Sequence, residues 1–189
     1  MNVDALLGGF VDAPLQSARA FRSALDALSR PGTICTVAGA APPAPLSVAA
    51  GVLILTLCDA TTPVHLAGAH DCAGVRDWII FHTGAPLVSA NHASFAIGTW
   101  PASQPVDRFS IGTPDYPDRS ATLIVELPDL AATGATLSGP GIQHQTQLSL
   151  PDTAAFRANH ALFPMGFDYF LTCGTRLAAL PRSTRVKDI

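Results

Sequence analysis

The chain has 189 residues, of which 48% are hydrophobic and 13% are charged, which is enough to bury one sizeable core. Eleven basic residues against 14 acidic residues give a net charge of −3, so the chain lacks the general basic surface that non-specific nucleic-acid binding needs. We therefore expect a single domain over residues 1–189 that does not bind nucleic acid.

Two features argue against export and membrane insertion. The first 16 residues contain no Lys or Arg ahead of their short apolar stretch, which a secretory signal requires. The longest apolar run, residues 48–58, is roughly half of the ~20 residues that span a bilayer. We expect a cytoplasmic protein without membrane contact.

The first predicted element is a helix over residues 15–28. Its apolar residues recur at steps of three and four, as in an amphipathic helix, and are Leu15, Ala18, Phe21, Leu25 and Leu28. Arg-Pro-Gly at 30–32 ends this helix, and residues 33–40 predict a short strand. The segment 47–57 is apolar on every face, so either a buried helix capped by Ser47 or a buried strand is consistent with it.

The middle of the chain predicts alternating strands and helices. Residues 61–68 indicate a strand, and residues 71–82 indicate a helix with Asp71 as its N-cap. Two strands are expected at 85–90 and 94–99. Residues 99–120 hold four prolines and predict a long loop, a kind of segment that often carries function.

Strand-like segments dominate the last third of the chain. Residues 120–128, 134–142 and 144–150 follow one another closely, which argues for antiparallel pairing in that part of the sheet. A helix is expected over 152–162, and the final pair of strands, 167–173 and 176–181, predicts a hairpin. The whole pattern predicts an α/β fold, a mixed sheet covered by helices on both faces.

The sequence lacks the residues that common cofactors require. Lys187 is the only lysine, and it lies two residues from the C-terminus, a poor place for a pyridoxal-phosphate Schiff base or a phosphate-binding loop. The four cysteines form no CxxC pair or cluster spacing, and the six histidines have no metal-ligand spacing. The glycines of 138–145 favour a tight turn over a nucleotide loop. We expect no pyridoxal phosphate, iron–sulfur cluster or metal.

Several polar residues are candidates for a functional site, each with a structural alternative. Asp59 and Asp168 border apolar runs, as catalytic carboxylates often do, yet ordinary capping and turn formation is the favoured explanation for both. His82 ends an apolar helix face and is either a packed residue or a base. In "PRSTR", residues 181–185, strand alternation would place Arg182 and Thr184 on one face. These residues are interpreted as an anion site, a solvated strand end or an interface to another chain.

Seven segments, in order over nearly the whole chain, resemble the PhnH family, a subunit of bacterial carbon–phosphorus lyase. They are "AFRSALDALSRPG" (20–32), "LTLCDATTPV" (55–64), "FHTGAPLV" (81–88), "PDRSATLIVEL" (117–127), "LSGPGI" (137–142), "FPMGFD" (163–168) and "LPRSTRV" (180–186). Each segment alone is weak, and the seven in register are specific.

The resemblance implies a cytoplasmic protein of phosphonate catabolism that acts in a complex with PhnG, PhnI and PhnJ. Such a complex supports the displacement of adenine from ATP by a phosphonate, which gives a ribose 1-phosphonate 5-triphosphate. The family's fold is similar to the large domain of pyridoxal-phosphate-dependent transferases without the cofactor, and its members can form homodimers. A ligand of this chain would then be ATP or a phosphonate.

No catalytic assignment transfers with the resemblance. The matched motifs include Arg22 and Arg182, which we expect to hold a phosphate or a partner's carboxylate. The full set of candidate anion or interface residues is Arg22, Asp59, His82, Asp168, Arg182 and Thr184. Two other hypotheses are a stand-alone enzyme that uses Asp59, His82 or Asp168 on an anionic substrate, and a purely structural dimeric subunit.

Overall fold

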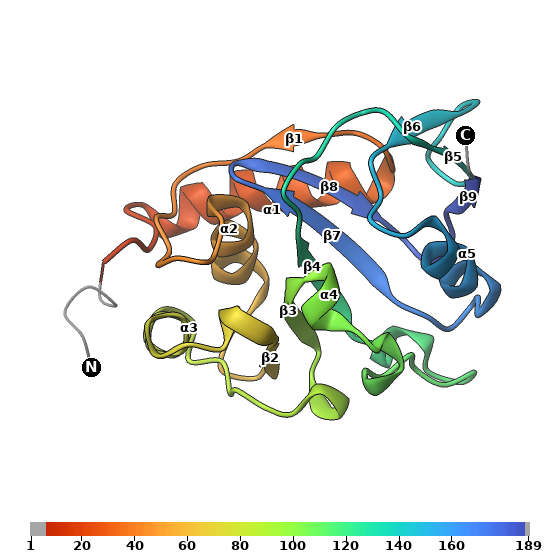
Figure 1. Ribbon diagram of the computed structural model, residues 1–189. Coiled ribbons are helices and arrows are strands. Elements are labelled where there is room, and N and C mark those ends of the chain that lie inside the picture. The colour runs from red at the N-terminus through yellow and green to blue at the C-terminus, as the bar shows by residue number, and fades with distance from the viewer. Residues whose placement is uncertain (1–6, 188–189) are drawn as a thin grey trace.

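A six-stranded mixed sheet lies at the centre of the computed structural model, which describes residues 7–187 (Figure 1). Residues 1–6, part of the N-terminal segment that predicts no secretory signal, lie outside the described residues. The strand order across the sheet is β1 (Cys35–Thr36), β8 (Arg176–Leu180), β7 (Asp168–Cys173), β4 (Thr122–Glu126), β3 (Phe95–Thr99) and β2 (Val64–Leu66).

Four strands of this sheet, β2, β3, β4 and β7, run parallel to one another. The last hairpin places β8 antiparallel to β7, with Tyr169 opposite Leu180, which confirms the predicted hairpin. The short edge strand β1 pairs antiparallel with β8. The carboxyl ends of the four parallel strands therefore meet at one edge of the sheet, where ligands bind in many α/β folds.

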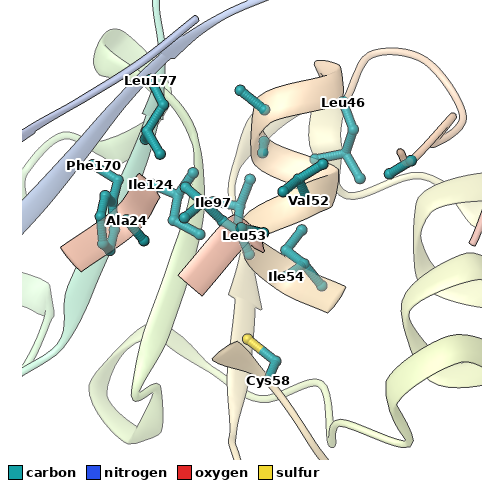
Figure 2. Close-up of a cluster of buried hydrophobic side chains, with 14 of the residues drawn as sticks. Ala24, Leu46, Val52, Leu53, Ile54, Cys58, Ile97, Ile124, Phe170 and Leu177 are labelled. Carbon is teal, nitrogen blue, oxygen red and sulfur yellow. The ribbon is translucent and has the colours of Figure 1, made fainter. Parts of the chain in front are cut away.

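Three helices cover one face of the sheet: α1 (Ala13–Ser29), α2 (Val48–Leu57) and α3 (Ala73–Thr83). Side chains of α1 and α2, among them Ala24 and Leu53, pack with Ile97, Ile124 and Phe170 of the sheet (Figure 2). Helix α3 packs against α2. The apolar segment 47–57 is a helix, and the side chain of Ser47 caps it by accepting a hydrogen bond from the Ala50 N–H at 3.1 Å. The alternative of a buried strand is wrong.

The other face is covered mainly by a second, three-stranded antiparallel sheet, with strand order β6 (Thr146–Leu148), β5 (Ala135–Ser138) and β9 (Arg185–Lys187). Helices α4 (Trp100–Ser103) and α5 (Thr153–Ala161) complete this layer. The prediction of helices on both faces is thus only partly right. Antiparallel pairing is confirmed for β5 and β6, whereas β4 is parallel to both of its neighbours.

Helix α1 faces the core with its small residues. Ala24 is 2% exposed, whereas Phe21 and Leu25 are 50% and 53% exposed. An apolar stripe normally faces the core. Here alanines occupy the inner face, where α1 packs against α2 and β8, and small side chains allow close packing of helix and sheet. Most of the stripe predicted from the sequence therefore faces away from the core, and only its last residue, Leu28, is half-buried and packs against it.

Smaller differences from the predicted elements have local causes. Cys72 is the N-cap residue of α3, because the Asp71 carboxylate pairs with Arg76 instead of capping the helix. Residues 85–90 form a single bridge, Val64 to Leu87, in place of a strand. The expected long loop at 99–120 contains α4 and two short 3-10 helices, η4 (Val106–Arg108) and η5 (Pro117–Arg119). Two more, η2 (Gly68–His70) and η3 (Ala90–His92), flank α3.

No helix among residues 7–187 combines the length and apolarity that crossing a bilayer requires.

Candidate functional site

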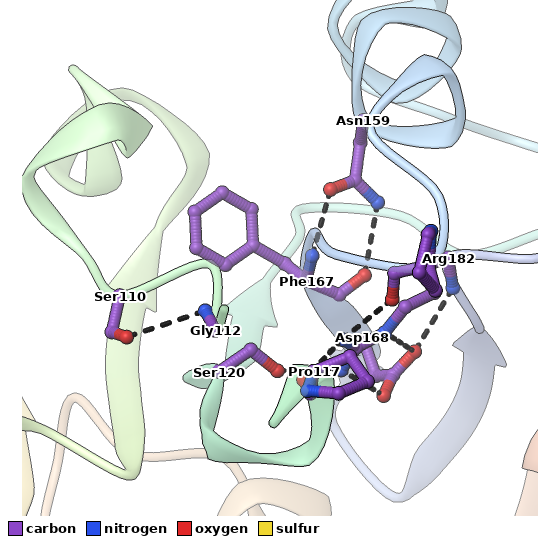
Figure 3. A network of polar contacts seen from close by, with 9 residues as sticks. Ser110, Gly112, Pro117, Ser120, Asn159, Phe167, Asp168 and Arg182 are labelled. Atoms are coloured by element: carbon purple, nitrogen blue, oxygen red, sulfur yellow. Dashed lines mark hydrogen bonds and ion pairs between the residues drawn. The ribbon is translucent and has the colours of Figure 1, made fainter. Parts of the chain in front are cut away.

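Arg182 lies at the centre of a polar network beside the start of β7 (Figure 3). Its Nη2 lies 2.7 Å from Oδ2 of Asp168, and its Nε lies 3.2 Å from Oδ1. The same guanidinium donates to Ser120 Oγ at 2.5 Å and to the carbonyl oxygens of Pro117 at 2.7 Å and Pro164 at 3.5 Å. The network joins residues 117–120, 164–168 and 182, which are distant in sequence.

The network changes the interpretation of "PRSTR". A guanidinium has five N–H donors, and the contacts of Arg182 are enough to occupy all of them. Its side chain is only 12% exposed. Residues 181–184 form a turn, and β9 begins only at Arg185, so the strand alternation predicted for Arg182 and Thr184 is wrong. Thr184 ends this turn and is buried, and its hydroxyl makes no hydrogen bond with any residue from 7 to 187.

Three other candidates lie in separate local settings. The Asp59 carboxylate accepts hydrogen bonds from Thr61 and Thr62, which lower its pKa, and so it forms a turn after α2. His82 packs against the Trp78 ring, with centroids 5.1 Å apart, and its Nε2 lies 3.3 Å from the Leu7 carbonyl oxygen. Arg22 lies exposed on α1. The structure brings together Asp168 and Arg182 only.

A pocket that the sequence did not indicate lies at the carboxyl ends of β3 and β4. It has a volume of about 500 Å³ and is lined by Pro45, His70, Thr99, Pro101, Glu126, Leu127 and Pro128. Glu126 is the last residue of β4, and Thr99 is the last residue of β3, directly opposite Glu126 in the register. His70 ends η2, the short helix that follows β2. Most of the lining is apolar, and Glu126 is its charged member.

The Glu126 carboxylate is held by two hydrogen bonds. Oε1 accepts from the Ser47 backbone N–H at 2.7 Å, at the N-terminus of α2, where the helix dipole favours a negative charge. Oε2 accepts from the Thr172 hydroxyl at 3.0 Å. The Glu126 side chain is 10% exposed. The carboxylate is thus fixed in one orientation at the base of the pocket.

His70 also lines the pocket, beside this carboxylate. Its ring is buried, and neither ring nitrogen makes a hydrogen bond of normal geometry within residues 7–187. Nε2 lies 4.0 Å from Oε1 of Glu126, too far for a hydrogen bond. Burial lowers the pKa of His70, and the nearby Glu126 carboxylate and Ala67 carbonyl oppose that shift only in part. His70 is therefore neutral at neutral pH.

Sequence reasoning missed this pocket because its residues come from separate segments. In the sequence, His70 is one of six histidines without metal-ligand spacing, and Glu126 falls within a predicted strand. The available signal was a carboxylate at the end of an otherwise apolar strand, "TLIVE", a position typical of functional residues in parallel sheets.

The fold and the pocket define an α/β protein with a small-molecule-sized pocket at the carboxyl ends of parallel strands. Residues 8–187 match the family of bacterial phosphonate metabolism proteins, PhnH. The chain belongs to the PhnH family, which confirms the resemblance seen in the sequence.

Two relatives are informative about the family. A protein of Rhizobium meliloti (strain 1021) described as "Alpha-D-ribose 1-methylphosphonate 5-triphosphate synthase subunit PhnH" is 40% identical over 95% of this chain and 94% of its own length. The "Putative C-P lyase subunit protein HtxG" of Stutzerimonas stutzeri is 29% identical over 92% of this chain and 87% of its own length. Both relatives are described as subunits of larger systems.

Proposed function

We propose that this chain is a subunit of a carbon–phosphorus lyase system and supports the formation of a ribose 1-phosphonate 5-triphosphate from ATP and a phosphonate. The observation that carries the proposal is the 40% identity, over 95% of the chain, to a protein described as a synthase subunit. The chain acts with other subunits and is not catalytic alone. Its partners are PhnG, PhnI and PhnJ, and it works in the cytoplasm.

The geometry of the candidate residues weighs against a stand-alone enzyme. Asp59 forms a turn, His82 packs on Trp78, and Asp168 is paired with Arg182. No nucleophile and base among these three lie within reach of one another in the described part of the chain. The expected likeness to the large domain of pyridoxal-phosphate-dependent transferases, without the cofactor, is part of this proposal.

The outward face of α1 supports the role of a subunit. Leu15, Phe21 and Leu25 lie exposed along one helix, and exposed apolar groups in a row are typical of protein interfaces. We name these three residues the α1 stripe. In this proposal the α1 stripe is an association surface, used in the complex or in a homodimer of the isolated chain.

The test is a reconstitution of the complex from purified subunits, with triphosphate product followed by phosphorus NMR. Omission of this chain is expected to abolish product formation. The double variant Phe21→Ser/Leu25→Ser is expected to remain folded by circular dichroism and to lose association and product together. The matched control is Phe163→Ser, which removes an equally exposed aromatic ring, 58% exposed, from a different surface. Product formation that is unchanged without this chain would contradict the proposal.

A further inference from the structure

The Glu126 carboxylate has no cationic partner in the described part of the chain. Within residues 7–187, no lysine or arginine lies within ion-pair distance of it, and the nearest basic group is the neutral ring of His70 at 4.0 Å. Among the described residues, only Ser47 and Thr172 donate to this carboxylate, which leaves lone pairs of both oxygens without a donor from that part of the chain. Carboxylates that are as little exposed as this one are normally paired with a positive charge, because desolvation otherwise disfavours the ionised form.

The walls of the pocket restrict the kind of cation. Pro45, Pro101, Pro128 and Leu127 give it apolar sides, and the volume of about 500 Å³ is far larger than a single ion or water needs. Its lining offers only two further polar side chains besides Glu126, those of His70 and Thr99, too few oxygen ligands for a metal ion. A phosphate or phosphonate would meet a carboxylate here and no basic residue. An organic cation with an apolar stem complements both the walls and the carboxylate.

We infer that this pocket binds a guanidinium or alkylammonium group, with its N–H donors on Glu126 and its apolar stem along the three prolines. His70 is a positioning residue in this site. Its uncharged ring lies beside the carboxylate without neutralising it, so the negative charge stays available to the ligand. The inference goes beyond the proposed function and does not depend on it, since it rests on this pocket alone.

The pH dependence of binding supplies a readout that a purely structural role of His70 would not give. Acidification protonates His70, which places a positive charge 4.0 Å from Oε1 and competes with the bound cation. The other charged groups beside η2, Asp71 and Arg76, pair with each other. Burial lowers the pKa of His70, so affinity for the cation should fall only at a pH below the ordinary histidine value of about 6.5. In the His70→Leu variant, the part of this loss of affinity that is caused by protonation of the imidazole ring should be absent.

The experiment titrates agmatine, a guanidinium on a four-carbon stem, into the full chain and follows backbone amide signals by NMR. Saturable shifts at Ser47 and Leu127 are expected, with a dissociation constant in the millimolar range, as small ligands allow. A capped Gly-Arg-Gly peptide is titrated in parallel. Tighter binding of the peptide identifies an arginine of another chain as the occupant, and tighter binding of agmatine identifies a free amine. Either result supports a site for an organic cation.

Glu126→Gln keeps an acceptor for the Ser47 N–H and removes the charge, and it should weaken agmatine binding at least about tenfold. The matched control is Asp129→Asn, which removes a carboxylate three positions away that is 70% exposed and lies outside the lining. If a variant fails to fold, the amide shifts that agmatine and the peptide cause in the wild-type chain still show whether a cation binds in this pocket. The inference is overturned if agmatine and the peptide leave Ser47 and Leu127 unshifted, if Glu126→Gln binds as well as wild type, or if methylphosphonate binds there more tightly than agmatine.

Discussion

Asp168 and Arg182 form a two-point ion pair, with both carboxylate oxygens accepting from one guanidinium. Asp168 begins β7, and Arg182 follows β8, so the pair joins the two ends of the final hairpin. The remaining donors of Arg182 hold Pro117, Ser120 and Pro164, which lie on other segments. The pair therefore ties the loop at 111–120 to the sheet.

Removal of this guanidinium should reduce stability. We expect Arg182→Ala to lower the free energy of unfolding by about 2–3 kcal/mol, because hydrogen bonds to charged groups are lost and Asp168 is left without its partner. Arg182→Lys should recover only part of the loss, since an ammonium lacks the planar fork. Chemical denaturation measures both. The control is Arg185→Ala on the exposed side of β9, expected to change stability by less than about 0.5 kcal/mol. Equal effects of the two alanine variants would contradict the structural role.

The orientation of α1 predicts opposite effects at neighbouring positions. Ala24→Leu should destabilise the chain by about 1–3 kcal/mol, because the added side chain must enter a packed core. Leu25→Ala should change stability by less than about 1 kcal/mol, because Leu25 is half exposed. Thermal unfolding of the isolated chain distinguishes the two. A larger loss for Leu25→Ala would mean that the α1 stripe faces the core after all.

His70 makes stability depend on pH. Its pKa is lower in the folded chain than in the unfolded chain, so the unfolded state binds more protons as the pH falls. The free energy of unfolding should therefore decrease as the pH is lowered below about 6.5, the ordinary histidine value. His70→Leu should flatten this dependence and raise stability at neutral pH by about 1 kcal/mol, since an unpaired buried polar group is removed. Urea unfolding between pH 5 and 8 tests this. An unchanged slope in the variant would exclude His70 as the cause.

Gly141 should tolerate no side chain. Its φ of +78° lies in the left-handed region, and an added Cβ would meet the Ser29 carbonyl oxygen at the end of α1. We expect Gly141→Ala to cost about 2–3 kcal/mol from backbone strain and this clash. Gly174→Ala is a useful comparison, because Gly174 also has a positive φ and an added Cβ there meets no atom within 4 Å. If backbone strain were the only cause, Gly141→Ala and Gly174→Ala would lower the free energy of unfolding by similar amounts in chemical denaturation.

Local patterns predicted most elements of this fold. Ser47 is an N-cap as expected, and the last two strands of the central sheet form the expected hairpin. The helix expected at 152–162 is present and begins after Asp152, its N-cap. The pattern of α1 identified an apolar face correctly. It could not show which face is inward, because that depends on the small residues needed where α1 crosses α2 and β8. The three-stranded sheet was missed because β9 pairs with β5, about 50 residues earlier in the chain.

The candidate site was less predictable than the fold. The sequence indicated both Arg182 and Asp168 as candidates. Their mutual pairing depends on a turn at 181–184, where the sequence pattern predicted a strand instead. Glu126 and His70 come together only through the parallel pairing of β2, β3 and β4. Parallel strands are joined through long crossover connections, so no short sequence motif contains both residues.

The position of α2 has a consequence for how the chain matures during synthesis. This helix, apolar on every face, leaves the ribosome well before β4, β7 and β8, the strands on which its layer packs. Domains bury such surfaces only when all of their layers are available, and exposed apolar segments aggregate in the meantime. Nascent chains that stop before residue 180 should therefore need a chaperone to stay soluble, and release of the last hairpin should end that need.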